Sequence, residues 1–120
     1  MPFVQVQTYR SSLTRAIVPG GARTIPTVRM MPEPGVGAGS NVAFIEFMYT
    51  DAASNLAGEA PDQRVFGFFP PSEFPVHREM LQSEAPVIVE WATDPSNQPF
   101  LNSITLRTSS EPVGQGPADP

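Results

Sequence analysis

Hydrophobic and polar residues alternate along much of the chain, and the clearest pattern covers residues 42–50. If this stretch is extended, Ile45, Phe47 and Tyr49 share one face, because successive side chains of a strand point to opposite sides. Its second face is also largely apolar and consists of Val42, Phe44, Glu46 and Met48. Two apolar faces are typical of a central strand, or of a strand whose second face is covered by another chain.

Similar patterns on both sides of this stretch predict an all-β domain. The other predicted strands are residues 3–9, 24–31, 64–69, 85–92 and 100–108. Pro19, Gly20 and Gly21 predict a turn, whereas the pattern of residues 11–18 before it is ambiguous. Gly67 lies in the middle of a predicted strand and indicates a bulge or a close approach of another part of the backbone.

One short helix is predicted from Ser72, as its N-cap, to about Gln82, with Pro75 in its first turn. The expected apolar stripe of this helix consists of Phe74, Val76, Met80 and Leu81. The residues His77, Arg78 and Glu79 of this helix are expected to face outward.

The order of these elements indicates a single β domain over residues 1–108, with a proline- and glycine-rich connection at 32–40. Residues 109–120 have the composition of an extended or disordered tail. From residue 24 onward the order resembles the five-stranded barrel of the OB-fold, with the short helix between the third and fourth barrel strands and residues 3–9 as an extra strand. A jelly-roll or Greek-key β-sandwich is the alternative fold.

Composition and charge narrow the functional classes. The formal net charge is −5 and all seven basic residues are arginines, so general binding to nucleic acid is disfavoured. The chain has no cysteine and one histidine, which argues against disulfides, thiolate metal sites and multi-histidine zinc sites. We expect no cofactor, no membrane span and no secretion signal, and therefore a location in the cytoplasm or within a particle.

The acidic segment at residues 51–63 contains residue types that can bind a cation. Its hard oxygen ligands are Asp51, Asn55, Glu59 and Asp62, but their spacing fits no EF-hand loop. A solvated loop is the expected structure.

The leading functional hypothesis is a non-enzymatic subunit that acts through protein–protein contacts. Methionine, aromatic residues and arginine are enriched in buried contact patches, and the candidate interface consists of Val42, Phe44, Glu46, Met48, Met30 and Met31. The expected partners are protein subunits, in a homo-oligomer or a larger assembly such as a virion or another particle.

Two alternatives remain open. The first is an OB-type module that binds a single nucleic-acid strand or a small ligand; its candidate face consists of Phe66, Phe68, Trp91, Arg29, Arg64 and Arg107. Packing in the core would explain these aromatic residues equally well. The second is a small acid–base enzyme that uses His77 with Glu73, Glu79 or Asp51.

Overall fold

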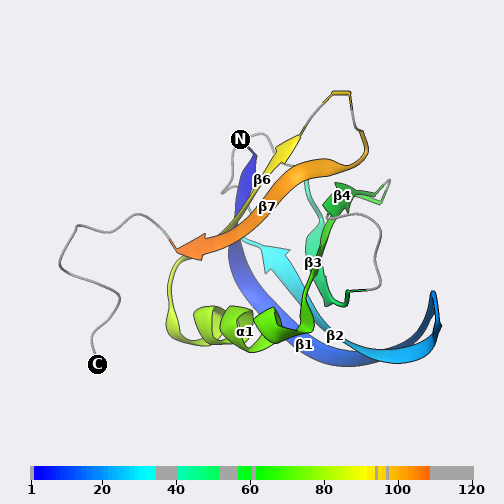
Figure 1. Ribbon diagram of the computed structural model, residues 1–120. Coiled ribbons are helices and arrows are strands. Elements are labelled where there is room, and N and C mark those ends of the chain that lie inside the picture. Colours follow the sequence, from blue (N-terminus) through cyan, green and yellow to red (C-terminus); the bar gives the residue numbers. More distant parts are fainter. Residues whose placement is uncertain are drawn as a thin grey trace.

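The chain forms one seven-stranded sheet that curls into a nearly closed barrel, and a short helix lies at one end of it (Figure 1). The computed structural model describes residues 2–34, 41–51, 57–60, 62–93, 95, 96 and 98–108. The strands are β1 (Phe3–Val18), β2 (Gly21–Pro32), β3 (Phe44–Tyr49), β4 (Ala57–Glu59), β5 (Arg64–Phe69), β6 (Val87–Thr93) and β7 (Leu101–Thr108). Helix α1 (Phe74–Ser83) follows a 3₁₀ turn, η1 (Pro71–Glu73).

The strand order in the sheet is β4-β5-β3-β2-β1-β6-β7. Neighbouring strands are antiparallel except for β3 and β5, which run parallel along their whole length. The two outermost strands approach each other, and a single bridge pairs Gly58 of β4 with Phe100, just before β7. This bridge brings the two ends of the curled sheet together.

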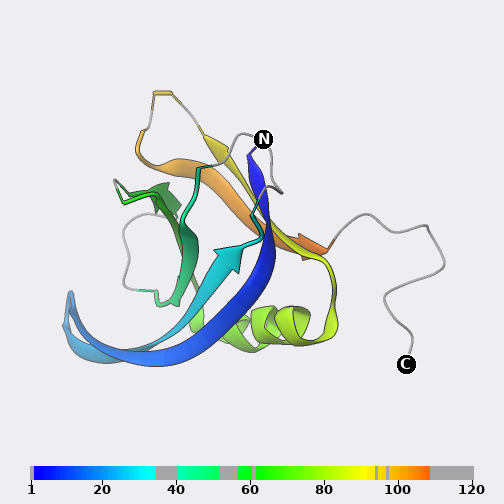
Figure 2. The ribbon, with the colours of Figure 1, turned by 180° about the vertical axis from the view of Figure 1, so that it is seen from behind.

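The small all-β barrel with one short helix between the predicted strands at 64–69 and 85–92 is confirmed. The ambiguous residues 11–18 turn out to extend the first strand, so that β1 and β2 form a long hairpin (Figure 2). The expected loop at 51–63 contains the short strand β4, because pairing with β5 supplies the order that its Ala-Gly-Glu sequence lacks. Residues 35–40 of the connection, Asn55 and the predicted tail at 109–120 lie outside the described residues.

The core is formed by the inward-facing residues of the long strands. The largest fully buried side chains are Val4, Val28, Met30, Ile45, Phe47, Tyr49, Val65, Val89 and Trp91. On β3 the alternation is as predicted, since Ile45, Phe47 and Tyr49 are buried and the residues between them are only half-buried. Burial of apolar surface is the main stabilising contribution to such a fold.

Helix α1 packs on the core through most of the predicted stripe. Phe74, Met80 and Leu81 contact the core as expected, but Val76 is 57% exposed and His77 is half-buried instead. The reason is the helical period, because positions 74, 77 and 81 share one face and position 76 does not. Ser72 is not the N-cap either; it lies inside η1, and Glu73 precedes the first residue of α1.

Gly67 lies on the inward side of β5, where the pairing with β3 is regular and the close neighbours are side chains, so neither the predicted bulge nor a close backbone approach is present. A β-carbon added there would lie 3.0 Å from Phe69 Cε2 and 3.2 Å from Ile104 Cγ2.

We predict that Gly67→Ala lowers the free energy of unfolding by about 1–3 kcal/mol, because overpacking outweighs the smaller gain from a stiffer unfolded chain. Urea unfolding of Gly67→Ala, with the exposed-site variant Thr105→Ala as control, measures this. A Gly67→Ala variant as stable as the wild type would contradict the prediction.

Candidate functional site

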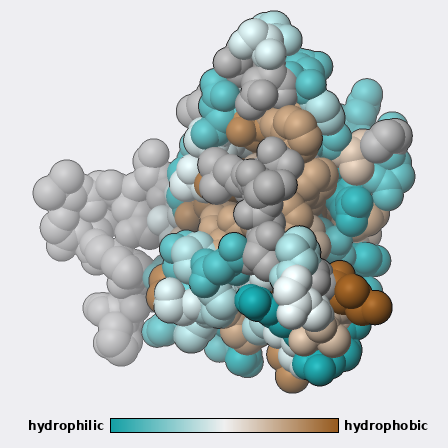
Figure 3. Space-filling view, turned by 45° about the vertical axis from the view of Figure 1, so that its right-hand side comes forward, coloured by the Kyte–Doolittle hydropathy of each residue, from teal (hydrophilic) through white to brown (hydrophobic). Residues whose placement is uncertain are grey.

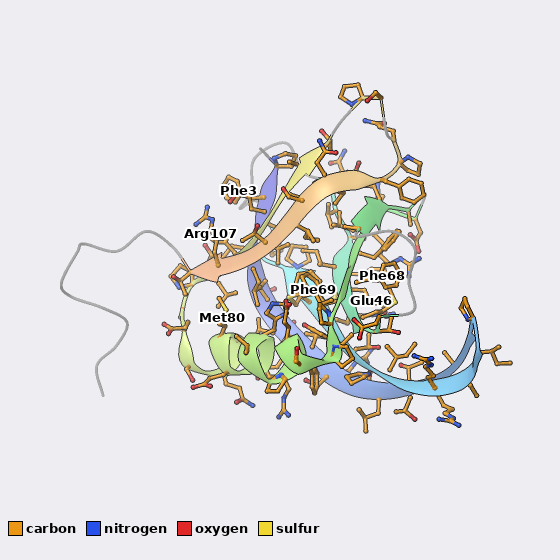
Figure 4. The ribbon with its side chains drawn as sticks, viewed as in Figure 1. Phe3, Glu46, Phe68, Phe69, Met80 and Arg107 are labelled. Carbon is orange, nitrogen blue, oxygen red and sulfur yellow. The ribbon has the colours of Figure 1, made fainter. Side chains whose placement is uncertain are left out.

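The side of the sheet opposite the core carries a group of apolar and charged residues on β2, β3 and β5. We call this group the outer face; it consists of Arg29, Phe44, Glu46, Met48, Arg64, Phe66 and Phe68. The register places them side by side, because Glu46 pairs with Arg29 of β2 and with Phe66 of β5. Figure 4 shows Glu46 and Phe68 on the outer side of these strands, whereas Phe69 lies on the side of α1.

Glu46 is the electrostatic centre of the outer face. Its side chain is only 12% exposed, and each carboxylate oxygen accepts a hydrogen bond from a different arginine. Arg29 Nη2 donates to Oε2 at 3.1 Å, and Arg64 Nη1 donates to Oε1 at 2.9 Å. A half-buried carboxylate therefore has two charge-assisted hydrogen bonds, which offset the cost of removing it from water.

The two arginines also cover aromatic rings of the outer face. Arg29 Cζ lies 4.5 Å from the centre of the Phe44 ring, and Arg64 Cζ lies 5.4 Å from the centre of the Phe66 ring. A planar guanidinium can stack on a ring and hydrogen-bond a carboxylate at its edge at the same time. The result is a row of Arg29, Glu46 and Arg64 that is held in place by two phenylalanines.

The rest of the outer face is apolar and half-buried. The rings of Phe66 and Phe68 meet edge to face, with centres 5.6 Å apart. Phe66 packs closely on Gly58 of β4, where a β-carbon would come within 2.7 Å of Phe66 Cζ. Figure 3 brings the side of the molecule that carries β3 and β5 forward and shows a broad, weakly hydrophobic surface near its centre.

The structure thus brings together residues that the sequence assigned to two separate candidate sites. Phe44, Glu46 and Met48 from the candidate interface lie beside Arg29, Arg64, Phe66 and Phe68 from the candidate ligand face. The period of two in the sequence reveals which residues of β3 share a face and which residues of β5 share a face. It does not reveal that β3 and β5 pair in parallel and so join these two rows.

Several predicted site residues lie elsewhere. Met30 is fully buried and Trp91 is only 1% exposed, so neither can contribute to an exposed face. Both belong to the inward rows of their strands, which a sequence pattern cannot tell from outward rows when both are apolar. Arg107 lies on β7 and donates to Glu90 Oε1 at 3.1 Å. Met31 is exposed, near Arg29 and Tyr9, at the side of a second cavity of about 300 Å³.

A cavity of about 280 Å³ lies beside Trp91. Besides Trp91, its lining includes Pro2, Asn41, Val42, Glu59, Gln63 and Arg64. The indole Nε1 of Trp91 and Nε of Arg64 are both buried, and neither has a hydrogen-bond partner in the described part of the chain. A buried N–H group without a hydrogen-bond partner costs about 1–3 kcal/mol, and both residues line the cavity.

His77 occupies an aromatic environment at the inner side of α1. Its Nδ1 lies 2.7 Å from the hydroxyl oxygen of Tyr49, and its ring packs on Phe47 and edge to face on Phe69. In the neutral tautomer that carries its proton on Nε2, Nδ1 accepts this hydrogen bond from Tyr49. The expectation of an outward-facing histidine is therefore wrong; the spacing of Phe74, His77 and Leu81 was the signal that could have corrected it.

The surroundings of His77 and Tyr49 shift the pKa of both groups. Burial lowers the pKa of His77 below its usual value, and the negative charge of Glu73 partly opposes that shift. Burial, reinforced by Glu73, raises the pKa of Tyr49 above its usual range. Both groups are therefore neutral at neutral pH. The hydrogen-bond partner of His77 is the fully buried Tyr49, rather than the Asp51 or Glu79 of the enzyme hypothesis.

Comparison with models of protein families finds no match, and comparisons with curated proteins and with solved structures find no significant similarity. In the described part of the chain, no helix has the length and apolar character needed to cross a membrane. The described residues also contain no group of three or more histidine and acidic side chains that could hold a metal ion.

We predict that His77 makes the fold less stable in mild acid. Because its pKa in the folded state lies below the unfolded value of about 6.5, its contribution is present above that pH and is lost as the pH falls through the folded-state pKa. Urea unfolding at pH 7.5, 6.5 and 5.5 should show a steeper loss of stability for the wild type than for His77→Gln, which cannot titrate. Equal pH dependence of the two proteins would refute this assignment.

Proposed function

We propose that this chain is a non-enzymatic interaction subunit that binds other protein subunits through the outer face. The observation that carries the proposal is the second row of β3, where Phe44, Glu46 and Met48 form a half-buried surface with Phe66 and Phe68 of β5. Aromatic residues, methionine and arginine are the residue types most enriched at protein interfaces.

The geometry of the charged row supports a protein partner. Glu46 and its two arginines are already hydrogen-bonded and stacked, so a partner meets a preformed surface and orders few additional side chains. The row combines one negative and two positive charges, which favours a partner surface with a complementary acidic group.

A nucleic-acid strand fits the outer face less well. Arg29 and Arg64 are paired with Glu46 rather than available to phosphates, and the chain has a formal net charge of −5. Salt-sensitive binding of a single-stranded oligonucleotide, lost on Phe68→Ala, would favour the nucleic-acid alternative over a protein partner.

We predict that Phe44→Asp and Phe68→Asp each weaken self-association or partner binding by about tenfold or more, since each places a charge in the centre of an apolar contact. Light scattering coupled to size exclusion, over a range of concentrations, measures the association. Glu46→Arg should also abolish it, but this variant would place a third guanidinium beside Arg29 and Arg64 and could disturb the fold.

The matched control is Thr105→Asp, which adds the same charge at an exposed position of β7. Circular dichroism and urea unfolding establish that each variant remains folded. If folded Phe44→Asp and Phe68→Asp associate as well as Thr105→Asp, the outer face is not the interface.

A second candidate function is the binding of a small polar ligand in the cavity beside Trp91. It rests on the two buried N–H donors, Trp91 Nε1 and Arg64 Nε, that lack a hydrogen-bond partner in the described part of the chain, although Arg64 Nε lies 3.9 Å from Asp62 Oδ1. Arg64 is already close to the carboxylates of Glu46 and Asp62, so a neutral carbonyl acceptor suits the cavity better than an anion.

Because Trp91 is the only tryptophan, its indole N–H gives a single resonance that reports on this cavity. We predict that an N-acetyl amino-acid amide, as a neutral probe, shifts this resonance in a saturable way, whereas acetate does not. Val42→Phe, which would fill the cavity, should remove the shift. No saturable shift with any amide probe would eliminate this candidate.

A further inference from the structure

The outer part of the β1–β2 hairpin, residues 10–25, projects from the barrel as a two-stranded ribbon (Figures 1 and 2). We call this part the arm. Strand β1 pairs with β6 only at Phe3, Val4 and Gln5, and β2 pairs with β3 only from Thr27 to Met30. Within the described part of the chain, both edges of the arm therefore carry backbone groups that no third strand pairs.

One side of the arm exposes large apolar residues. Leu13 is 71% exposed and Ile17 is 89% exposed. They lie on the same side of the ribbon as their cross-strand partners Pro26 and Ala22. In Figure 3, strongly hydrophobic residues stand at the lower right, on the side to which the arm projects.

This apolar side continues the inward row of the barrel. Pro26 of β2 is followed on the same face by Val28 and Met30, which are fully buried in the core. The inward row thus continues out of the barrel along the arm, where no described residue covers Leu13 or Ile17. Because an isolated two-stranded hairpin is at best marginally stable in water, a covering surface would stabilise the arm.

The charge of the arm is opposite to that of the rest of the chain. Residues 10–25 contain Arg10, Arg15 and Arg23 and no acidic residue, which gives the arm a charge of +3. The formal net charge of −5 therefore leaves −8 on the remaining residues. Opposite charges on two parts of one chain favour contacts between the arm of one copy and the body of another.

We propose that the arm lies on the barrel of a second copy of this chain, with Leu13 and Ile17 buried in the contact and Arg15, which lies between them on the same side, facing its acidic body. Two copies can exchange arms reciprocally around a two-fold axis, so that the apolar residues of both arms are buried in a closed dimer. The inference goes beyond the proposed function because it names the partner and uses a surface separate from the outer face.

The experiment compares two substitutions that add the same charge to the same strand. Ile17→Asp alters the apolar side of the arm, whereas Ser12→Asp alters an exposed position on its other side. In sedimentation velocity of the full chain at several concentrations, we expect wild type and Ser12→Asp to dimerise, and Ile17→Asp to dimerise about tenfold more weakly or not at all. Dimerisation should also weaken as salt is added, because the arm and the body attract electrostatically.

The arm and the outer face are distinguished by adding Phe44→Asp to the same series. Dimerisation that Ile17→Asp abolishes and Phe44→Asp preserves supports the arm and counts against the outer face as the self-association surface. A monomeric wild type at millimolar concentration, or equal dimerisation of Ile17→Asp and Ser12→Asp, overturns the proposal. Tight, salt-sensitive binding of duplex DNA that Arg15→Ala and Arg23→Ala both weaken, without dimerisation, would overturn it in favour of nucleic acid as the occupant.

The native chain contains no cysteine, which permits a direct test of contact. A photo-crosslinker attached to a single cysteine in Ala22→Cys, on the side of Ile17, should join the arm to the barrel of another copy, and mixing isotopically labelled with unlabelled chains identifies such intermolecular products. Crosslinks found only within one chain would contradict the proposal.

Discussion

Strand β3 is paired along both edges and buries one row of side chains, and the rest of the barrel depends on this arrangement. Ile45, Phe47 and Tyr49 fill the centre of the core, and the last two also meet Phe69 and His77. They therefore connect the sheet to α1. Because side chains alternate strictly along a strand, the burial of this row forces Phe44, Glu46 and Met48 onto the opposite side. The outer face is a direct consequence of the way the core is filled.

The arginine-only composition has a structural role on the outer face. Arg29 and Arg64 each hydrogen-bond Glu46 and lie over a phenylalanine ring, which a lysine ammonium group could not do with the same geometry. Both oxygens of the largely buried Glu46 carboxylate accept a hydrogen bond, which offsets the cost of its burial. The arm uses arginine differently, since Arg15 reaches only the hydroxyl of Thr24, at 3.3 Å, and remains exposed. One residue type thus serves a preformed surface in one region and an open, positively charged ribbon in another.

Three features of the structure are not explained by the packing of the core: the outer face, the arm and the cavity beside Trp91. The outer face is half-buried and preformed, whereas the arm carries large apolar residues, Leu13 and Ile17, that no other described residue covers. The cavity beside Trp91 presents buried donors instead, which suits a small polar ligand. The outer face and the cavity share Arg64 of β5, whereas the arm is formed by the outer parts of β1 and β2. Substitutions in the arm can therefore be tested without altering the other two places.

The sequence by itself determined the all-β class, the position of the helix and the inward row of β3, because these depend on local periodicity and turn residues. It could not decide which apolar row of β2 and β6 faces the core, so Met30 and Trp91 were assigned to surfaces although they are buried. Only the tertiary structure decided the parallel pairing of β3 with β5, the strand β4 and the projecting arm. The pairing of β3 with β5 joins residues 20 positions apart, and a local pattern carries no information about which strand becomes the neighbour. The arm and β4 pair with strands close in sequence, but their own residues show no clear alternating pattern.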